Sequence, residues 1–435
     1  MLIAILISAL AQTPGADTSA LTLAAAQERA LAANPTLRAQ RADARAAAAG
    51  PWEASRALLP TITADAQALR STDPVAVFGM KLRQGSFSAG DLALSALNQP
   101  APYTDYTARV SVEQPLISLD GWYGHAAAGR AAAAQAAAVR RTAGATILNV
   151  TQAYWDAQLA AGRVAALDTG LVAARAHAEQ AEALHAQGLV SGLDARLARL
   201  RAARFEAQRV AAAADADNAL AALRAVLALP DSTALRLVDP LAVDSSFEST
   251  SVGVLETRGD LAALDQGIRA AQLGVRRAWA ANLPSLALFG TVAQHSHVGP
   301  GNGGSGDWTV GIGLQWRPFA GLSGAGAVAR ARAERDAVAA RREAALRQAR
   351  FEVAQSERLH AAALLRTRVA QAARAEAVEA LQQAALRYRT GAAPVTELLD
   401  VQAALTNADL DLLAARHDVL VAAALYDFAN GVFDR

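Results

Sequence analysis

The chain of 435 residues contains the same arrangement of landmarks twice. In the first copy, an Asn-Pro-Thr-Leu segment ending at Leu37 is followed by a Leu-Pro pair at Pro60 and then by a segment of alternating polar and apolar residues. In the second copy, Arg-Gly-Asp-Leu ending at Leu261 is followed by Leu-Pro at Pro284 and by another alternating segment. The interval between leucine and proline is identical in both copies. A constant spacing between matched landmarks indicates an internal duplication of one large structural unit.

Two long tracts are rich in alanine and contain no proline. Alanine has the highest helix propensity of any residue, so these tracts predict long helices over about residues 121–187 and 323–390. Gly188 and Gly391 follow them, as expected where a helix ends in a left-handed residue. Each copy therefore contains one helix of roughly 100 Å, at 1.5 Å per residue.

A return helix should follow each glycine, over about residues 193–229 and 396–430. Each return helix is about half as long as its partner, and a shorter helix before the Leu-Pro landmark fills the remaining length. Pro51 lies inside the first of these shorter helices and is expected to kink it, because proline removes an internal hydrogen bond.

Between the shorter helix and the long helix, each copy contains two segments in which polar and apolar residues alternate. Such alternation predicts strands with one polar and one apolar face. Tryptophan stands at both ends of the last segment, as at a membrane interface. We interpret the segments as membrane strands, with four strands of a water-soluble sheet as the alternative. They cover about residues 61–70, 106–114, 285–294 and 308–316.

The N-terminus resembles a signal peptide. Its first 11 residues are apolar and end in Ala-x-Ala at Ala11, although no basic residue precedes the apolar run. Such a segment is removed during secretion, here after Ala11 or as far along as about residue 20. The mature chain then divides into a first repeat at residues 21–229, a linker at 230–255 and a second repeat at 256–430.

Composition excludes several classes of function. The net charge of +1 provides no electrostatic basis for binding nucleic acid. The absence of cysteine excludes disulfides and zinc–thiolate sites. No segment after the N-terminus is long and apolar enough to predict a transmembrane helix.

The ordered motifs resemble the TolC-type outer-membrane efflux family. The matching segments are the paired starts, the Leu-Pro strand entries, the strand exits at 112–116 and 314–319, and the turns at 188–194 and 388–400. The resemblance implies a mixed α/β membrane protein of Gram-negative bacteria that forms a homotrimer. Each protomer would contribute four strands to a 12-stranded transmembrane β-barrel. Its long helical hairpins would form a periplasmic α-barrel, with the linker in an equatorial region.

The resemblance also implies the function of an exit duct for efflux or type I secretion, which passively conducts solutes from periplasm to exterior. Its partners would be a periplasmic adaptor (membrane fusion) protein, an inner-membrane pump and outer-membrane lipid. The alternative is a periplasmic adaptor or structural coiled-coil protein that bridges envelope components. Adaptors carry one helical hairpin, however, and lack the duplicated helix–strand–strand–helix order.

The resemblance assigns roles to four residues near the helix tips. Glu397 and Asp400 match acidic residues that form two rings at the periplasmic aperture, where carboxylates favour cations. The alternative is that they are solvated first-turn acids stabilised by the helix dipole. Tyr388 and Asp194 match a hydrogen-bonded pair that holds the pore shut. A family arginine that adds a further lock is replaced here by Ala393.

The tip turns are expected to dock the adaptor, with ordinary turn residues as the alternative. These residues are Gly188, Leu189, Val190, Ser191, Gly391, Ala392, Ala393 and Pro394.

Other motifs indicate no chemistry. His295 and His297 begin a hairpin turn with their side chains expected on one side, but no further metal ligand stands near them in sequence. The glycine-rich segment at 299–306 lacks the Lys-Ser/Thr of a nucleotide-binding loop. We find no catalytic nucleophile–base arrangement in the sequence. We therefore expect no cofactor, no metal and no enzyme activity.

Overall fold

The computed structural model describes residues 19–242, 255, 258–299 and 302–434, which fall into two compact units. The helical unit comprises the described residues within 19–42, 137–262 and 344–434. The sheet unit comprises residues 43–136 and 263–343. The signal peptide expected at residues 1–11 lies outside the described residues, as does most of the second half of the expected linker.

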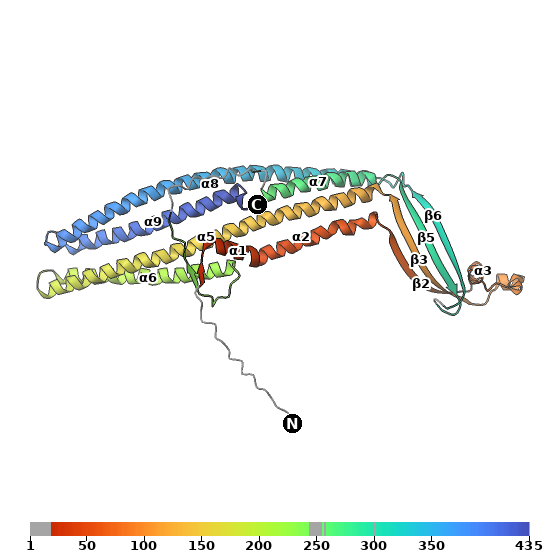
Figure 1. Cartoon of the computed structure of the whole chain (residues 1–435), viewed down its shortest axis with the longest axis horizontal. Coiled ribbons are helices and arrows are strands. Elements are labelled where there is room, and N and C mark those ends of the chain that lie inside the picture. The colour runs from red at the N-terminus through yellow and green to blue at the C-terminus, as the bar shows by residue number, and fades with distance from the viewer. Residues whose placement is uncertain (1–18, 243–254, 256–257, 300–301, 435) are drawn as a thin grey trace, which may run out of the picture. The chain divides into compact units, whose positions relative to one another are not determined.

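The elements follow the duplicated order that the landmarks predict (Figure 1). In chain order, the helices and strands are β1 (Ser19–Leu21), α1 (Leu23–Ala33), α2 (Pro35–Ala54), β2 (Thr61–Ser71), α3 (Pro74–Arg83), α4 (Leu94–Asn98), β3 (Tyr103–Ile117), α5 (Leu119–Ala186), α6 (Gly192–Val226), β4 (Leu235–Leu237), α7 (Gly259–Ala280), β5 (Ser285–Ser296), β6 (Ser305–Gln315), α8 (Ser323–Arg389) and α9 (Val395–Ala429). Short 3-10 helices cover Ser55–Ala57, Ala89–Leu92 and Val432–Asp434.

The helical unit is built from two antiparallel hairpins, α5 with α6 and α8 with α9 (Figure 1). Small side chains allow close contact between the helices, as at Ala174 and Ala198, which are completely buried. Larger side chains such as Phe205 fill the spaces between them. None of the described helices is both long and apolar enough to cross a membrane.

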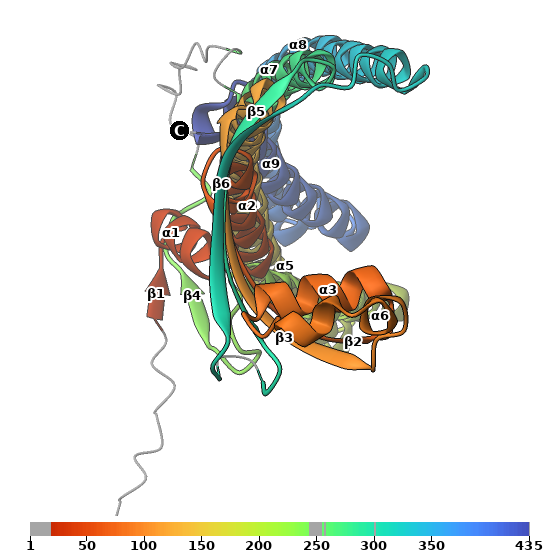
Figure 2. The ribbon, with the colours of Figure 1, turned by 90° about the vertical axis from the view of Figure 1, so that its right-hand side faces the viewer.

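The sheet unit contains an antiparallel sheet of four strands in the order β2-β3-β5-β6 (Figure 2). The alternation in the sequence gives this sheet two different faces. On one face, apolar side chains from all four strands stand exposed: Ile62, Val110, Val292 and Ile312 are between 47% and 71% exposed.

The other face of the sheet is polar. Asp65 of β2 lies directly opposite Arg109 of β3 in the strand register. Cross-strand pairs of opposite charge stabilise a sheet modestly. The period-two pattern therefore places most apolar side chains on one face and most polar ones on the other, with Arg70, Leu69 and Phe289 as exceptions.

Two boundaries differ from the sequence prediction because the backbone accommodates residues that normally end an element. β3 extends past Pro115 to Ile117, with a register irregularity at that point, whereas the predicted strand ends at residue 114. Proline is tolerated at such bulges. α6 ends at Val226, three residues before the predicted end, and Ala228 adopts the left-handed φ of 52° that usually requires glycine.

The segments at the two ends of the first repeat meet in the helical unit. β1 pairs in parallel with β4, which lies in the expected linker. The buried Tyr154 hydroxyl donates to the Leu21 carbonyl oxygen at 2.9 Å and contacts an Asp239 carboxylate oxygen, also at 2.9 Å. These contacts attach the N-terminal strand and the linker to α5. Pro51 lies within α2, which continues to Ala54.

Candidate functional site

The two hairpins of the helical unit reverse direction through the same turn. Gly188 and Gly391 adopt φ values of 71° and 73°. The residue after each glycine donates its N–H to a carbonyl five residues back, at 2.9 Å and 2.8 Å respectively. This 6→1 bond defines a Schellman motif, which satisfies carbonyls that the helix end leaves free. The left-handed conformation of this turn therefore accounts for the presence of glycine at both positions.

Most of the turn residues expected to dock an adaptor are accessible in the single chain. Val190 and Ala393 are half-buried, and the others are exposed: Gly188, Leu189, Ser191, Gly391, Ala392 and Pro394.

The two return helices begin differently. Ser191 caps α6 with a capping box, in which the Ser191 hydroxyl and N–H donate to the Asp194 carboxylate at 2.8 Å and 3.2 Å. Pro394 occupies the same position before α9, where no side chain caps the helix. A capping residue such as serine is worth about 1 kcal/mol. The first return helix thus has a side-chain cap that the second lacks.

Each acidic residue expected at the aperture pairs with an arginine. Arg387 Nη1 lies 2.5 Å from Glu397 Oε1, across the α8–α9 turn. Arg201 Nη2 lies 2.5 Å from Asp400 Oδ1 and joins α6 to α9. Glu397 and Asp400 lie one turn apart near the start of α9. Sequence reasoning identified both acids but neither arginine.

Tyr388 lies inside the second tip. It is 6% exposed and packs with Val395 and Leu398 in one hydrophobic cluster. Its hydroxyl has no hydrogen-bond partner among the described residues. Burial raises the pKa of the Tyr388 phenol, and the charge of Asp194 raises it further. The expected hydrogen bond between Tyr388 and Asp194 remains a prediction for the assembled protein.

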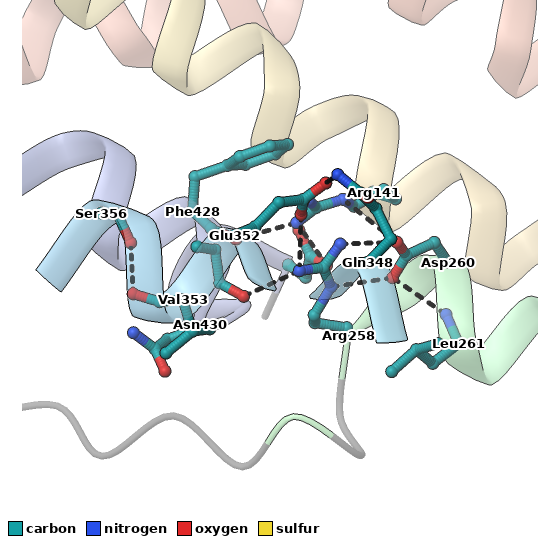
Figure 3. Close-up of polar contacts among 12 residues, drawn as sticks. Arg141, Arg258, Asp260, Leu261, Gln348, Glu352, Val353, Ser356, Phe428 and Asn430 are labelled. Atoms are coloured by element: carbon teal, nitrogen blue, oxygen red, sulfur yellow. Dashed lines mark hydrogen bonds and ion pairs between the residues drawn. The ribbon is translucent and has the colours of Figure 1, made fainter. Parts of the chain in front are cut away.

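A buried charge cluster lies where the second repeat begins (Figure 3). Arg258 is 2% exposed and uses its whole guanidinium group. It donates to Asp260 at 2.7 Å and 3.1 Å, to Glu352 at 3.0 Å and to the Ala429 carbonyl oxygen at 2.9 Å. Arg258 thus connects the start of α7 to α8 and to the end of α9.

The C-terminal turn completes this cluster. Asp434 is buried and accepts the Gly259 N–H at 2.8 Å. Arg141 lies 3.5 Å from the Phe428 ring centroid and donates to the Phe428 carbonyl oxygen at 2.8 Å. Burial raises the pKa of the Asp434 carboxyl. Arg258 and Gly259 belong to a recognised sequence landmark, whereas nothing in the sequence marks Arg141 or Asp434 as their partners.

The histidine pair does not form a metal site. His295 is buried, with Nδ1 at 2.9 Å from Asp105 and Nε2 at 3.3 Å from Asp307, while His297 is exposed. The two histidines therefore differ in burial, and the expectation that their side chains lie on one side stays a prediction. Among the residues that the structure describes, no group of three or more His, Cys, Asp or Glu side chains is arranged to hold a metal.

Solved structures share this fold over nearly the whole chain. A membrane protein from Pseudomonas aeruginosa matches with a TM-score of 0.80 and 22% identity, covering 94% of this chain and 92% of that one. VceC, an outer membrane protein of Vibrio cholerae, matches with a TM-score of 0.79 and 20% identity, covering 94% and 96%. The MtrE outer membrane channel of Neisseria gonorrhoeae gives 0.77 and 20%, covering 94% and 88%. The chain thus has the fold of outer-membrane channels.

The sequence itself identifies the family. The model of the outer membrane efflux protein family matches residues 26–229 and 252–430, so the chain belongs to that family. No curated protein matches the sequence. The resemblance to TolC-type proteins is confirmed, and with it the location in the outer membrane and the general role in efflux transport.

Proposed function

We propose that three copies of this chain form a gated exit duct, which passively conducts solutes from the periplasm to the exterior. Residues 21–229 and 256–430 would be its two repeats, preceded by a signal peptide. The observation that carries the proposal is the open four-stranded sheet: β2 and β6 form its edges, both are 11 residues long, and neither pairs with another described strand on its outer side.

The sheet favours a shared barrel for two physical reasons. An open edge in lipid leaves backbone N–H and C=O groups without partners, at a cost of several kcal/mol each. Pairing β2 of one copy with β6 of the next would satisfy both edges. The apolar face suits lipid, because Trp308 and Trp316 stand at its two ends and Ile312 lies midway between them.

The helical unit supports a duct that extends into the periplasm. Its helices pack through alanine, which suits the wall of an α-barrel. The tips would form the periplasmic aperture, with Glu397 and Asp400 as acidic rings and Tyr388 with Asp194 as the gate. A periplasmic adaptor would dock on the turns and connect the duct to an inner-membrane pump. The duct would supply a path and no catalysis, and the family relationship favours this role over that of an adaptor.

Extraction from cells tests the trimer. The wild-type protein should appear as a heat-modifiable trimer in the detergent-soluble outer-membrane fraction. Ile312→Arg should reduce its amount strongly, because arginine at the middle of a lipid-facing strand costs about 2–4 kcal/mol. Thr309→Arg, on the opposite face of β6, should leave it intact. A wild-type protein recovered as a soluble periplasmic monomer would contradict the proposal and favour the adaptor alternative.

Single-channel recording tests the gate. Tyr388→Phe combined with Asp194→Ala should raise the conductance in a planar bilayer by releasing the closed state. Asp194→Ala also removes the capping box of α6, so Ser191→Ala provides the matched control: it breaks the same cap and leaves the gate pair in place. Unchanged conductance in the double variant would exclude these residues from the gate.

A further inference from the structure

The acidic residues at the aperture are not isolated charges. Asp400 is 71% exposed at its side chain, but its Oδ1 lies 2.5 Å from Arg201, whose side chain is only 27% exposed. Arg387 bridges Glu397, but with the exposure reversed: the Arg387 side chain is 55% exposed and that of Glu397 is 33% exposed. Each predicted carboxylate ring is therefore accompanied by a ring of arginines from the same three chains.

The charge of the two tips is complementary. Within 13 residues on either side of the turn glycine, the first tip carries one positive charge in excess and the second tip carries one negative charge in excess. In the first tip, the charged residues are Arg175, Glu179, Glu182, Asp194, Arg196, Arg199 and Arg201. In the second tip, they are Glu379, Arg387, Arg389, Glu397 and Asp400. Together the two tips are neutral.

We propose that Arg201 and Arg387 determine the ion selectivity of the aperture by neutralising the carboxylates of Asp400 and Glu397. The inference rests on the proposed duct, in which these side chains surround the entrance. A ring of bare carboxylates attracts cations and repels anions. An opposite charge within a few ångströms turns each carboxylate into half of a dipole, whose field falls off faster with distance than that of a bare charge. The field is therefore already weak at distances shorter than the Debye length of about 8 Å at physiological salt. The entrance thus admits anionic and neutral solutes as readily as cationic ones.

The Arg201–Asp400 pair also joins α6 to α9, so a purely mechanical role must be separated from an electrostatic one. A mechanical latch controls how wide the aperture opens, and its loss changes the conductance for all ions alike. A charge-compensating residue changes the ratio of cation to anion permeability. Conductance and reversal potential therefore distinguish the two roles in the same recording.

The experiment is the reversal potential of purified protein in a planar bilayer under a tenfold KCl gradient. Wild-type pores should have a K⁺/Cl⁻ permeability ratio near one. Arg201→Gln and Arg387→Gln should each raise the ratio by roughly threefold, because each exposes three carboxylates at the pore entrance. The double variant should raise it further, and Asp400→Asn alone should lower it below one. Arg201→Lys should retain the wild-type ratio, because it preserves the charge.

Arg199→Gln provides the matched control. Arg199 lies on the same helix, two residues before Arg201, but its carboxylate partner is Glu182 of α5 at 3.7 Å. Its loss should leave the permeability ratio within error of wild type. Strong cation selectivity in the wild type, or an unchanged ratio in both glutamine variants with only the conductance altered, would overturn the inference and leave the duct intact. Wild-type protein that forms no pores would overturn the inference together with the proposed function.

Discussion

The two repeats make the same helix junction with different chemistry. In the first repeat, the Asn34 amide donates to the carbonyl oxygen of Val226, the last residue of α6, at 3.4 Å. In the second repeat, Arg258 donates to the carbonyl oxygen of Ala429, the last residue of α9, at 2.9 Å. A single amide in one copy thus corresponds to a buried, multiply bonded guanidinium in the other.

The residues that follow Asn34 and Arg258 explain why the second junction needs one more hydrogen-bond acceptor than the first. Pro35 begins α2 and has no N–H to satisfy. Gly259 begins α7, and its N–H is accepted by Asp434. Leu37 and Leu261, two positions further on, are almost completely buried in both copies. The duplication therefore retained the apolar anchor of the junction, while its polar contacts diverged.

Among the variants that test this comparison, Arg258→Ala should cause the largest loss in the free energy of unfolding. Arg258→Ala leaves Asp260 and Glu352 without their main partner, and the loss of one member of a buried ion pair costs about 3 kcal/mol. The corresponding Asn34→Ala should cost about 2 kcal/mol, because it removes the bond to Val226 and also the cap of α2, in which Asn34 Oδ1 accepts the Leu37 N–H at 3.1 Å. Urea unfolding of the detergent-solubilised protein measures both. Equal losses would show that the two junctions have the same strength.

Gly259→Ala should have the next largest effect. A Cβ atom there would lie 2.7 Å from the Ala137 carbonyl oxygen and from the Arg141 backbone nitrogen. Overpacking of this kind typically costs about 1–3 kcal/mol. Gly274 in the same helix has no atom within 4 Å of such a Cβ, so Gly274→Ala should stabilise α7 by about 1 kcal/mol. Thermal unfolding midpoints that shift in the same direction would contradict this prediction.

The C-terminal ends of the return helices offer a smaller, reciprocal test. Ala228 after α6 has a φ of 52°, and Gly431 occupies the same place after α9 with a φ of 74°. Ala228→Gly should stabilise the protein by about 1 kcal/mol, because glycine adopts this conformation without a steric penalty. Gly431→Ala should destabilise it, since the new Cβ would also lie 2.9 Å from Arg258 Cγ. Denaturant midpoints should move in opposite directions for the two variants.

The smallest effect concerns pH. Burial raises the pKa of Asp434, so the folded state holds this proton more tightly than the unfolded state does. The resulting stability is present below the unfolded pKa, near 4, and is lost as pH rises through the folded pKa. Relative to Asp434→Asn, the wild type should therefore lose stability as pH rises above about 4.

Two comparisons keep this pH test specific. Burial opposes ionisation of Asp260, but hydrogen bonds and charge from Arg258 outweigh it and lower the pKa of Asp260. This contribution has the opposite sign, and because the charge of Asp260 also raises the pKa of Asp434, the measured difference belongs to the coupled pair of carboxyls. Asp231→Asn, at the exposed position of the first repeat that corresponds to Asp434, is the control. A wild-type-minus-variant stability that is flat with pH would exclude Asp434 as the source.

Local patterns were sufficient to predict most elements of this fold. Alternation of polar and apolar residues predicted the four strands, and alanine content with terminal glycine predicted the helical hairpins. The pattern failed at Pro115 and at Ala228. Proline usually ends a strand, but β3 continues through Pro115, and alanine usually continues a helix, but Ala228 adopts a left-handed conformation just after α6 ends. Both errors concern single residues whose conformation depends on what packs around them.

Long-range polar partners could not be predicted in this way. Arg201 and Asp400 are 199 residues apart in the chain, and Gly259 and Asp434 are 175 apart. No local signal connects such pairs, because their contact depends on how α6, α7 and α9 come together. Family resemblance identified Glu397 and Asp400 as acidic residues of interest, but it gave no indication of the arginines that accompany them.

The order of strands in the sheet has a consequence for how the chain folds. β3 pairs with β5, and the chain between Ile117 and Ser285 contains the whole of α5, α6 and α7. Closing so long a loop is entropically costly unless the intervening helices are already paired. The hairpins, whose contacts are local, should therefore form first and bring the two halves of the sheet together. Late pairing leaves the inner edges of β3 and β5 unpaired for longer, so these edges are exposed to aggregation until the two halves of the sheet meet.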